Sequence, residues 1–187
     1  MTEREIHIIE AAFSLFLRYG VKRTSMNDIA QEAGIARQTL YNAFSNKDAI
    51  LRATIRLFTE RAMAEVETGL RSSDTLAGKL DIVFGQLAVK PYEMLHASPN
   101  AEDIISGMNA ASREEIAANN LAFQAALERV LSDANDAIAQ NGLTPKALAE
   151  ILQTAASAAK EKAATRAHLD ELLTSLRLVA LAIAEPR

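Results

Sequence analysis

Five side chains suited to binding nucleic acid lie close together in the sequence. They are Arg37, Gln38, Thr39, Tyr41 and Asn42. Arginine can form two hydrogen bonds with guanine, and glutamine can do the same with adenine, at base edges in the major groove. The hydroxyl groups of threonine and tyrosine suit phosphate oxygens. The cluster therefore indicates a DNA-binding surface, although Arg37 taken alone is also compatible with an ordinary solvated charge.

The residues around this cluster predict two short helices joined by a tight turn. Ser25 is a good N-cap for a helix over about 26–33, because its hydroxyl can accept a bond from a free backbone amide. Gly34 supplies the positive φ that ends such a helix, and a second helix is expected over about 36–44. Small or apolar residues are expected to face inward: Ile29, Ala30, Ala33, Ile35, Leu40 and Phe44. This arrangement predicts a helix-turn-helix, whose second helix enters the major groove.

Lys47 lies at the beginning of the next predicted helix, where Ser45 or Asn46 is the expected cap. Backbone amides at a helix N-terminus favour anions, and a lysine side chain suits a phosphate oxygen. We therefore expect Lys47 to add a phosphate contact beside the helix-turn-helix.

The stretch TSMNDIAQEAGIARQTLYNAFSNKDAIL resembles the signature of TetR-type transcriptional regulators. The residues before it, AAFSLFLRYGVKRTS, resemble the first helix of that family and its glycine. The resemblance is specific over roughly residues 5–55, and beyond them only the helix pattern agrees. The shared elements are Thr24-Ser25, Ile29-Ala30, Ala33-Gly34-Ile35, Thr39-Leu40-Tyr41, Phe44, and Asn46-Lys47 before Leu51.

The resemblance implies a role for each matching side chain. Phosphates are expected at Thr24, Tyr41 and Lys47, and base edges at Arg37, Gln38 and Thr39. The full predicted DNA-binding set also includes Ser25 and Asn42. The chain departs from the family at Ala36, where a capping serine is frequent, at Gln38, where a glycine is frequent, and at Asn42-Ala43. These departures affect the choice of operator, so the resemblance implies no DNA sequence.

Composition and periodicity predict an all-α fold. Strong helix formers dominate the 187 residues, glycine and proline are scarce, and no alternating β-branched run is present. We expect about nine helices in two domains. Residues 1–48 form the three-helix domain with the helix-turn-helix, and residues 49–187 form a ligand-binding and dimerisation domain.

Several boundaries are expected in the second domain. A fifth helix should end before Pro91, and residues 92–111 should be broken by Pro99, Gly107 and Asn109. Ser112 and Glu115 have the spacing of a capping box that opens a long helix. The remaining predicted boundaries are Gly142, Thr144-Pro145 and Pro186.

Charge and cysteine content limit the class of protein. The net charge is −4, but residues 1–58 carry +2 and the remainder −6, which fits a chain that contacts phosphates at one end. Cysteine is absent, so disulfide, zinc-thiolate and cysteine-nucleophile chemistry are excluded. No signal peptide or apolar membrane span is apparent. We expect a cytoplasmic chain with no membrane partner.

The apolar residues around the broken segment predict a cavity for a small-molecule effector, since cavities form at irregular helix junctions. Each residue alone is also compatible with ordinary core packing. The resemblance supports a ligand site in the second domain. The predicted lining is Phe84, Leu87, Tyr92, Met94, His96, Ile104, Met108 and Phe123.

The last two helices predict a homodimer interface. One is rich in alanine (Ala155, Ala156, Ala159 and Ala163) and the other in leucine, from Leu169 to Leu176. A helix-turn-helix generally needs a second copy to read enough base pairs.

The sequence thus predicts a homodimeric, ligand-responsive regulator, most simply a repressor of a near-palindromic double-stranded DNA operator. A helical ligand-binding or adaptor protein without DNA binding is the alternative. An enzyme is disfavoured. Glu93 and His96 have the spacing of a di-iron ligand pair, but no second such pair exists in the sequence. We expect no cofactor, no metal and no catalytic residue.

Overall fold

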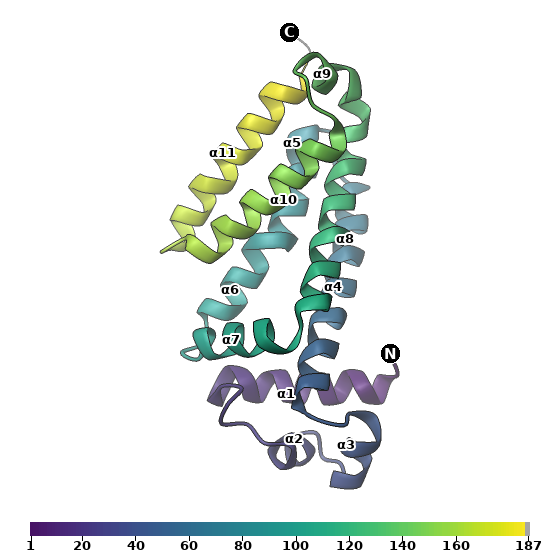
Figure 1. Ribbon diagram of the computed structural model, residues 1–187, viewed down its shortest axis with the longest axis vertical. Coiled ribbons are helices and arrows are strands. Elements are labelled where there is room, and N and C mark those ends of the chain that lie inside the picture. Colours follow the sequence, from purple (N-terminus) through teal and green to yellow (C-terminus); the bar gives the residue numbers. More distant parts are fainter. Residues whose placement is uncertain (186–187) are drawn as a thin grey trace. The chain divides into compact units, whose positions relative to one another are not determined.

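The computed structural model describes residues 1–185 and all of their side chains except those of residues 109–111. The described chain is all-helical and contains no strand (Figure 1). The helices are α1 (Glu3–Tyr19), α2 (Met26–Glu32), α3 (Arg37–Ala43), α4 (Lys47–Leu70), α5 (Leu76–Phe84), η1 (Gly85–Val89), α6 (Lys90–His96), α7 (Ala101–Ala111), α8 (Arg113–Leu131), η2 (Ser132–Ala134), α9 (Asn135–Gln140), α10 (Pro145–Lys162) and α11 (Arg166–Ala184).

In two places, consecutive helices join without a break. A π-helical turn, η1, joins α5 to α6, and a 3₁₀ turn, η2, joins α8 to α9. Counted as continuous segments, the described residues form nine helices, which confirms the predicted all-α architecture. Pro186, predicted to follow the last helix, lies outside the described residues. No described helix has the length and apolarity needed to cross a membrane.

The chain divides into two compact units, each with its own hydrophobic core. Unit 1 comprises residues 1–60 and 94–119. Unit 2 comprises residues 61–93 and the described residues from 120 onward. The division into domains at residues 48 and 49 stays a prediction.

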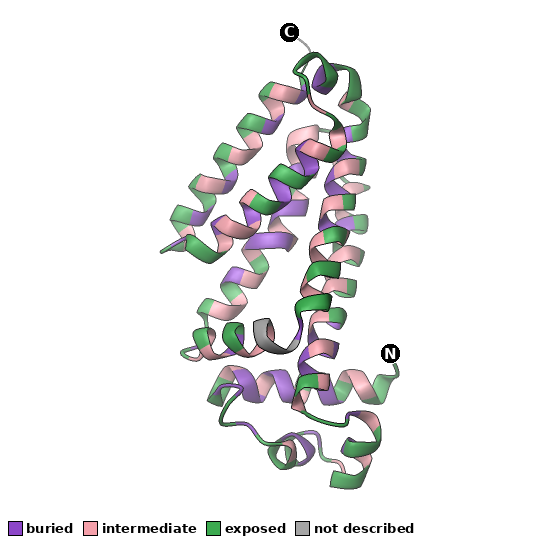
Figure 2. Ribbon diagram, viewed as in Figure 1, coloured by how far each residue is buried: buried purple, intermediate pink, exposed green. Residues whose placement is uncertain are grey.

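Unit 1 is built around α1. Thr2 and Glu5 form a capping box at its N-terminus, and its apolar face is buried against the other helices of the unit (Figure 2). The ring of Phe13 meets the ring of Phe58 edge-on, with the ring centroids 4.8 Å apart. The helix ends at Gly20, whose φ of +84° favours glycine.

In the same unit, α7 packs against the end of α1. Ile104 is completely buried in the unit 1 core. A Cβ atom added at Gly107 would lie 3.0 Å from a methyl group of Val21. The small residue therefore permits the close approach of α7 to the turn after α1.

Unit 2 contains a second core, made from α5, η1, α10 and α11 together with parts of α4, α6, α8 and α9. Thr144 caps α10 by accepting a bond from the amide of Ala147 at 3.1 Å, and Pro145 occupies the first helical position. These contacts confirm the predicted beginning of that helix.

The prediction that the fifth helix ends before Pro91 is wrong. Helical structure continues through Pro91 to His96. The wide turn η1 precedes the proline, and there the amide of Lys90 donates to the carbonyl of Gly85, five residues back. Since proline has no N–H and its ring crowds the preceding turn, a π-helical turn lets the chain pass without a break.

The predicted capping box at Ser112 is also wrong. The Oγ of Ser112 is buried without a hydrogen-bond partner among the described residues. Glu115 instead accepts a bond from Arg56 at 3.0 Å. Glu115 thus pairs with α4 and does not complete the local cap, and the local sequence gives no sign of this distant partner.

The alanine-rich face of α10 does not face outward as the predicted dimer interface required. Ala156, Ala159 and Ala163 are buried in the core of unit 2, and so are Leu169 and Leu173 of α11. The small residues therefore permit close packing within one chain. The apolar side chains left exposed on these two helices are different ones: Ile151, Leu178 and Val179.

Candidate nucleic-acid interface

The helix-turn-helix forms as the sequence predicts. Ser25 caps α2, and its backbone amide donates to Asp28 at 2.8 Å in return. Ala30 is 3% exposed, which allows α2 and α3 to pack closely. Gly34 has φ +64°, and the amide of Ile35 then donates to the carbonyl of Ala30 at 3.0 Å. The backbone of the turn is therefore closed and satisfied.

The second helix, α3, presents its polar side chains to solvent. Leu40 is completely buried and anchors the inner face. On the outer side, the guanidinium of Arg37 lies 5.5 Å from the ring centroid of Tyr41. Gln38 donates to the side-chain oxygen of Asn42 at 3.0 Å. Thr39 is partly buried, and the other four are exposed. The five predicted residues thus lie on one short helix, and ring stacking and a hydrogen bond order four of them.

The first position of α3 lacks a cap, as predicted. No side chain at Ala36 bonds the free amides of the helix. These amides remain available to an acceptor from outside the chain, which a phosphate oxygen could supply.

Lys47 holds the loop between α1 and α2. Its ammonium group donates to the carbonyl of Val21 at 2.5 Å and to the carbonyl of Thr24 at 2.9 Å. The third N–H of the ammonium is left for another acceptor. Thr24 is 3% exposed, and its hydroxyl donates to the carbonyl of Gly20 at 2.7 Å. Two predicted phosphate ligands therefore also build the loop.

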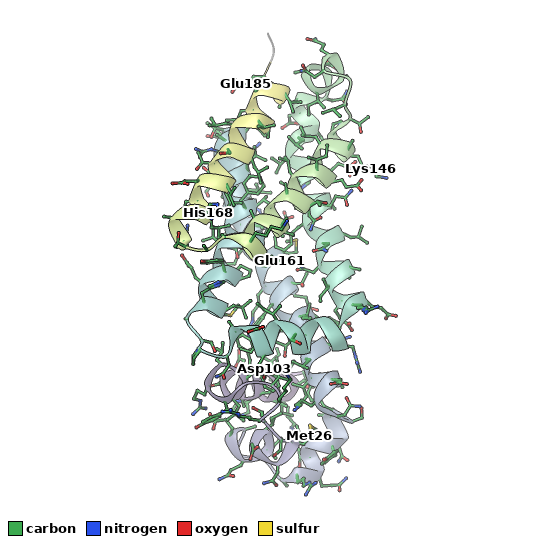
Figure 3. All side chains as sticks on the ribbon, turned by 60° about the vertical axis from the view of Figure 1, so that its left-hand side comes forward. Met26, Asp103, Lys146, Glu161, His168 and Glu185 are labelled. Carbon is green, nitrogen blue, oxygen red and sulfur yellow. The ribbon has the colours of Figure 1, made fainter. Side chains whose placement is uncertain are left out.

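The other side of this loop is held by the residues that begin α7. Asn100 donates to the carbonyls of Leu17 and Arg18, at 3.2 and 3.0 Å. The carboxylate of Asp103, labelled in Figure 3, accepts a bond from the backbone amide of Lys22 at 3.0 Å. That amide lowers the pKa of Asp103, so the bond persists at neutral pH and is lost when acid protonates the carboxyl.

These α7 contacts were not predicted, because they join residues about eighty positions apart in the sequence. His7 was also missed. Its Nε2 donates to the carbonyl of Ala33 at 3.0 Å, which ties α1 to the end of α2. An isolated histidine or aspartate carries no local pattern that could have indicated either contact.

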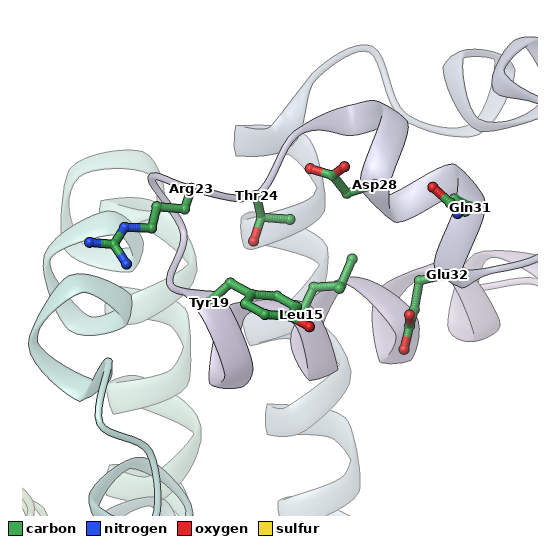
Figure 4. A pocket seen from close by; sticks show the side chains of 7 residues that line it. All are labelled: Leu15, Tyr19, Arg23, Thr24, Asp28, Gln31 and Glu32. Atoms are coloured by element: carbon green, nitrogen blue, oxygen red, sulfur yellow. The ribbon is translucent and has the colours of Figure 1, made fainter.

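A cavity of about 560 Å³ lies beside the loop, between α1 and α2 (Figure 4). Its lining is polar and charged in large part: Leu15, Tyr19, Arg23, Thr24, Asp28, Gln31 and Glu32. Glu32 is paired with Arg18. None of the predicted effector-binding residues lines this cavity.

The predicted effector-binding residues fall into two groups. Phe84, Leu87, Tyr92 and Phe123 are buried together in the unit 2 core. Ile104 is buried in the unit 1 core, and Met94 and Met108 pack against that core. His96 is exposed, and Glu93 is bonded to Arg166 at 2.8 Å. The predicted apolar residues are therefore divided between the two cores.

Comparison with known proteins agrees with this architecture. Residues 8–54 match the family model for "Bacterial regulatory proteins, tetR family". The HTH-type transcriptional repressor KstR2 of Rhodococcus jostii (strain RHA1) is 29% identical over 102 residues, which cover 52% of this chain and 46% of that protein. The chain thus spans less than half the length of this curated relative.

Two solved structures extend the likeness of fold along nearly the whole chain. A TetR transcription regulator from Haloarcula marismortui ATCC 43049 has a TM-score of 0.72 at 19% identity, covering 98% of this chain and 97% of that one. The SmeT–triclosan complex has a TM-score of 0.64 at 22% identity, covering 97% and 91%.

The fold and the site define a helix-turn-helix protein with a separate helical body. The family model and the curated relatives indicate a TetR-type transcriptional regulator. The solved structures show that its fold is similar along nearly the whole chain.

The contacts of Lys47 predict a structural effect of its removal. Lys47→Met leaves the carbonyls of Val21 and Thr24 without their charged donor, so we expect the free energy of unfolding to fall by about 1–3 kcal/mol. Urea unfolding measures this loss. Lys90→Met is the control, because Lys90 is exposed on α6 and should change stability little. Equal stability of the two variants would contradict the role of Lys47 in the loop.

Proposed function

We propose that this protein is a ligand-responsive repressor that binds a near-palindromic DNA operator as a homodimer in the cytoplasm. One observation carries the proposal: α3 is anchored by a buried leucine and turns Arg37, Gln38, Tyr41 and Asn42 to solvent. No catalytic function is proposed. The alternative, a helical adaptor without DNA binding, gives no reason for this ordered polar face.

The proposed contacts divide into two kinds. Arg37 and Gln38, with Thr39, read base edges in the major groove. Tyr41 and the third N–H of Lys47 bind phosphate oxygens, which fix the register of α3 without reading sequence. Thr24 and Ser25, whose hydroxyls are engaged within the chain, support the loop that approaches the backbone.

Arg37 gives the sharpest test of DNA recognition. A preferred site is first selected from a pool of random duplexes with the wild-type protein. Arg37→Ala should then lose about 1–3 kcal/mol at one base pair of each half-site, and much less on random duplex. Arg113→Ala serves as the control, since Arg113 is an exposed residue at the beginning of α8. Equal losses of Arg37→Ala on both kinds of DNA would rule out base reading.

Dimerisation through α10 and α11 follows from what DNA recognition requires. The two recognition helices of a dimer must lie about 34–36 Å apart to enter successive major grooves. Exposed apolar side chains on these helices are available for a partner. Ile151, Leu178 and Val179 are 52%, 58% and 54% exposed in the single chain, and we propose that they form the centre of the interface.

Leu178 tests this interface. We expect a wild-type dimer at micromolar concentration, and Leu178→Asp should shift it toward monomer because the interface would bury an unpaired charge. Sedimentation velocity measures the change. Leu121→Asp is matched to it, since Leu121 is 64% exposed on α8, and it should remain dimeric. A wild-type monomer, or a dimer that survives Leu178→Asp, would refute the proposed interface.

We propose that the effector binds among the buried aromatic and aliphatic residues of unit 2, Phe84, Leu87, Tyr92 and Phe123. It can release DNA only if it binds the DNA-free geometry more tightly than the DNA-bound one. Only a few residues of the chain separate α6 from the side chains that hold the loop between α1 and α2. α6 leads directly into Asn100 and Asp103, which bond the end of α1 and Lys22. A shift of α6 would therefore alter the loop, and a coupling of about 1–3 kcal/mol suffices.

A further inference from the structure

One face of α10 that points into unit 2 carries a lysine. Ala149, Gln153 and Ala156 lie on this face at spacings of four and three residues, and they are 0%, 6% and 0% exposed. Lys160 occupies the next position in the same spacing and is partly buried. The aliphatic part of the Lys160 side chain therefore lies on the buried face of α10, where Ala156 and Ala159 belong to the apolar core.

The polar neighbours of Lys160 are mainly hydrogen-bond donors. The side-chain nitrogen of Gln153 donates to the Oγ of Ser157 at 3.1 Å. This bond leaves the second N–H of Gln153 and the hydroxyl proton of Ser157 available. Ser157 and Lys160 are three residues apart, so their side chains are neighbours on the helix. The acceptors of the cluster are the Oε1 of Gln153 and the remaining lone pair of the Ser157 Oγ, and its other polar groups are donors.

Among the described residues, Lys160 forms no ion pair with a carboxylate. None of the carboxylates in the described residues lies within 4.0 Å of its ammonium group. Burial lowers the pKa of Lys160, and the adjacent Glu161 acts in the opposite direction. A partly buried charge without a partner costs free energy, so an anion brought by a ligand would gain a charge-assisted hydrogen bond there.

We propose that Gln153, Ser157 and Lys160 bind the head group of the effector, and that the effector is an amphipathic carboxylate. A carboxylate has one negative charge and two oxygens that only accept hydrogen bonds, which matches one cation beside two donors. The apolar part would pack among Phe84, Leu87, Tyr92 and Phe123, which belong to the same hydrophobic cluster as Ala156. The inference rests on the proposed function, because it names the chemical class of the effector, but the binding itself needs no DNA.

The test compares acids with uncharged molecules of the same shape. Straight-chain carboxylates from hexanoate to tetradecanoate are titrated calorimetrically into the full chain, beside the primary alcohols of the same lengths. At least one acid should bind about tenfold more tightly than its alcohol. Lys160→Met should abolish this preference, and Lys160→Arg should retain most of it.

Two further variants separate the ligand contact from charge and folding. Lys162→Met removes the same charge from an exposed position on the same helix and should keep the preference. Ser157→Ala leaves the charge in place and should weaken only the acid. If Lys160→Met fails to fold, as circular dichroism would show, the arginine and alanine variants still decide the outcome.

The possible results are distinguishable. No preference for the acid at any length overturns the inference. A preference that survives Lys160→Met also overturns it, because the lysine stem then only covers the core while its ammonium group stays hydrated. If the acids bind as expected but leave operator affinity unchanged, the carboxylate site stands and the proposed regulatory function fails.

Discussion

The carbonyl groups at the end of α1 and in the loop after it need hydrogen-bond donors, and two distant segments supply them. Lys47 donates to the carbonyls of Val21 and Thr24 from one segment. Asn100 donates to the end of α1 from the other, where Asp103 also accepts the amide of Lys22. Unpaired polar backbone groups in a buried setting cost free energy. The loop before α2 is therefore held only when both segments are in place.

This constraint connects the two tasks proposed for the protein. The loop ends at Ser25, the cap of α2, and α2 in turn supports α3 through the closed turn at Gly34. Any displacement of α7 alters the bonds at Asp103 before it reaches the recognition helix. The proposed DNA-binding face is therefore held by hydrogen bonds within α2, the turn and α3, while its attachment to α1 depends on a few charged hydrogen bonds that a modest free energy could shift.

Local signals in the sequence predicted the helix-turn-helix and most helix boundaries, because caps and glycine turns act over a few residues. Gly34 and Thr144 are examples. The predicted helix end before Pro91 was wrong because a π-helical turn upstream accommodates the proline. The predicted capping box at Ser112 was wrong because Glu115 pairs with a distant arginine. The bond between Asp103 and the amide of Lys22 could not be predicted from the sequence, since it depends on packing between remote segments. The apolar part of the proposed effector site was chosen from apolar residues alone. Lys160 was not among the predicted residues, because Gln153, Ser157 and Lys160 form no known motif.

The central claim is that the hydrogen bonds of Lys47, Asn100 and Asp103 to the loop before α2 set the geometry for DNA binding. The most direct test is the Asp103→Ala variant. Amide hydrogen exchange over residues 20–25 and operator affinity are measured on the same sample. Glu102→Ala is the control, since Glu102 is an exposed acid one residue away. We predict faster exchange at Lys22 and weaker operator binding for Asp103→Ala only, with the protection of Leu40 in α3 unchanged. Faster exchange at Lys22 with undiminished operator affinity would contradict the account.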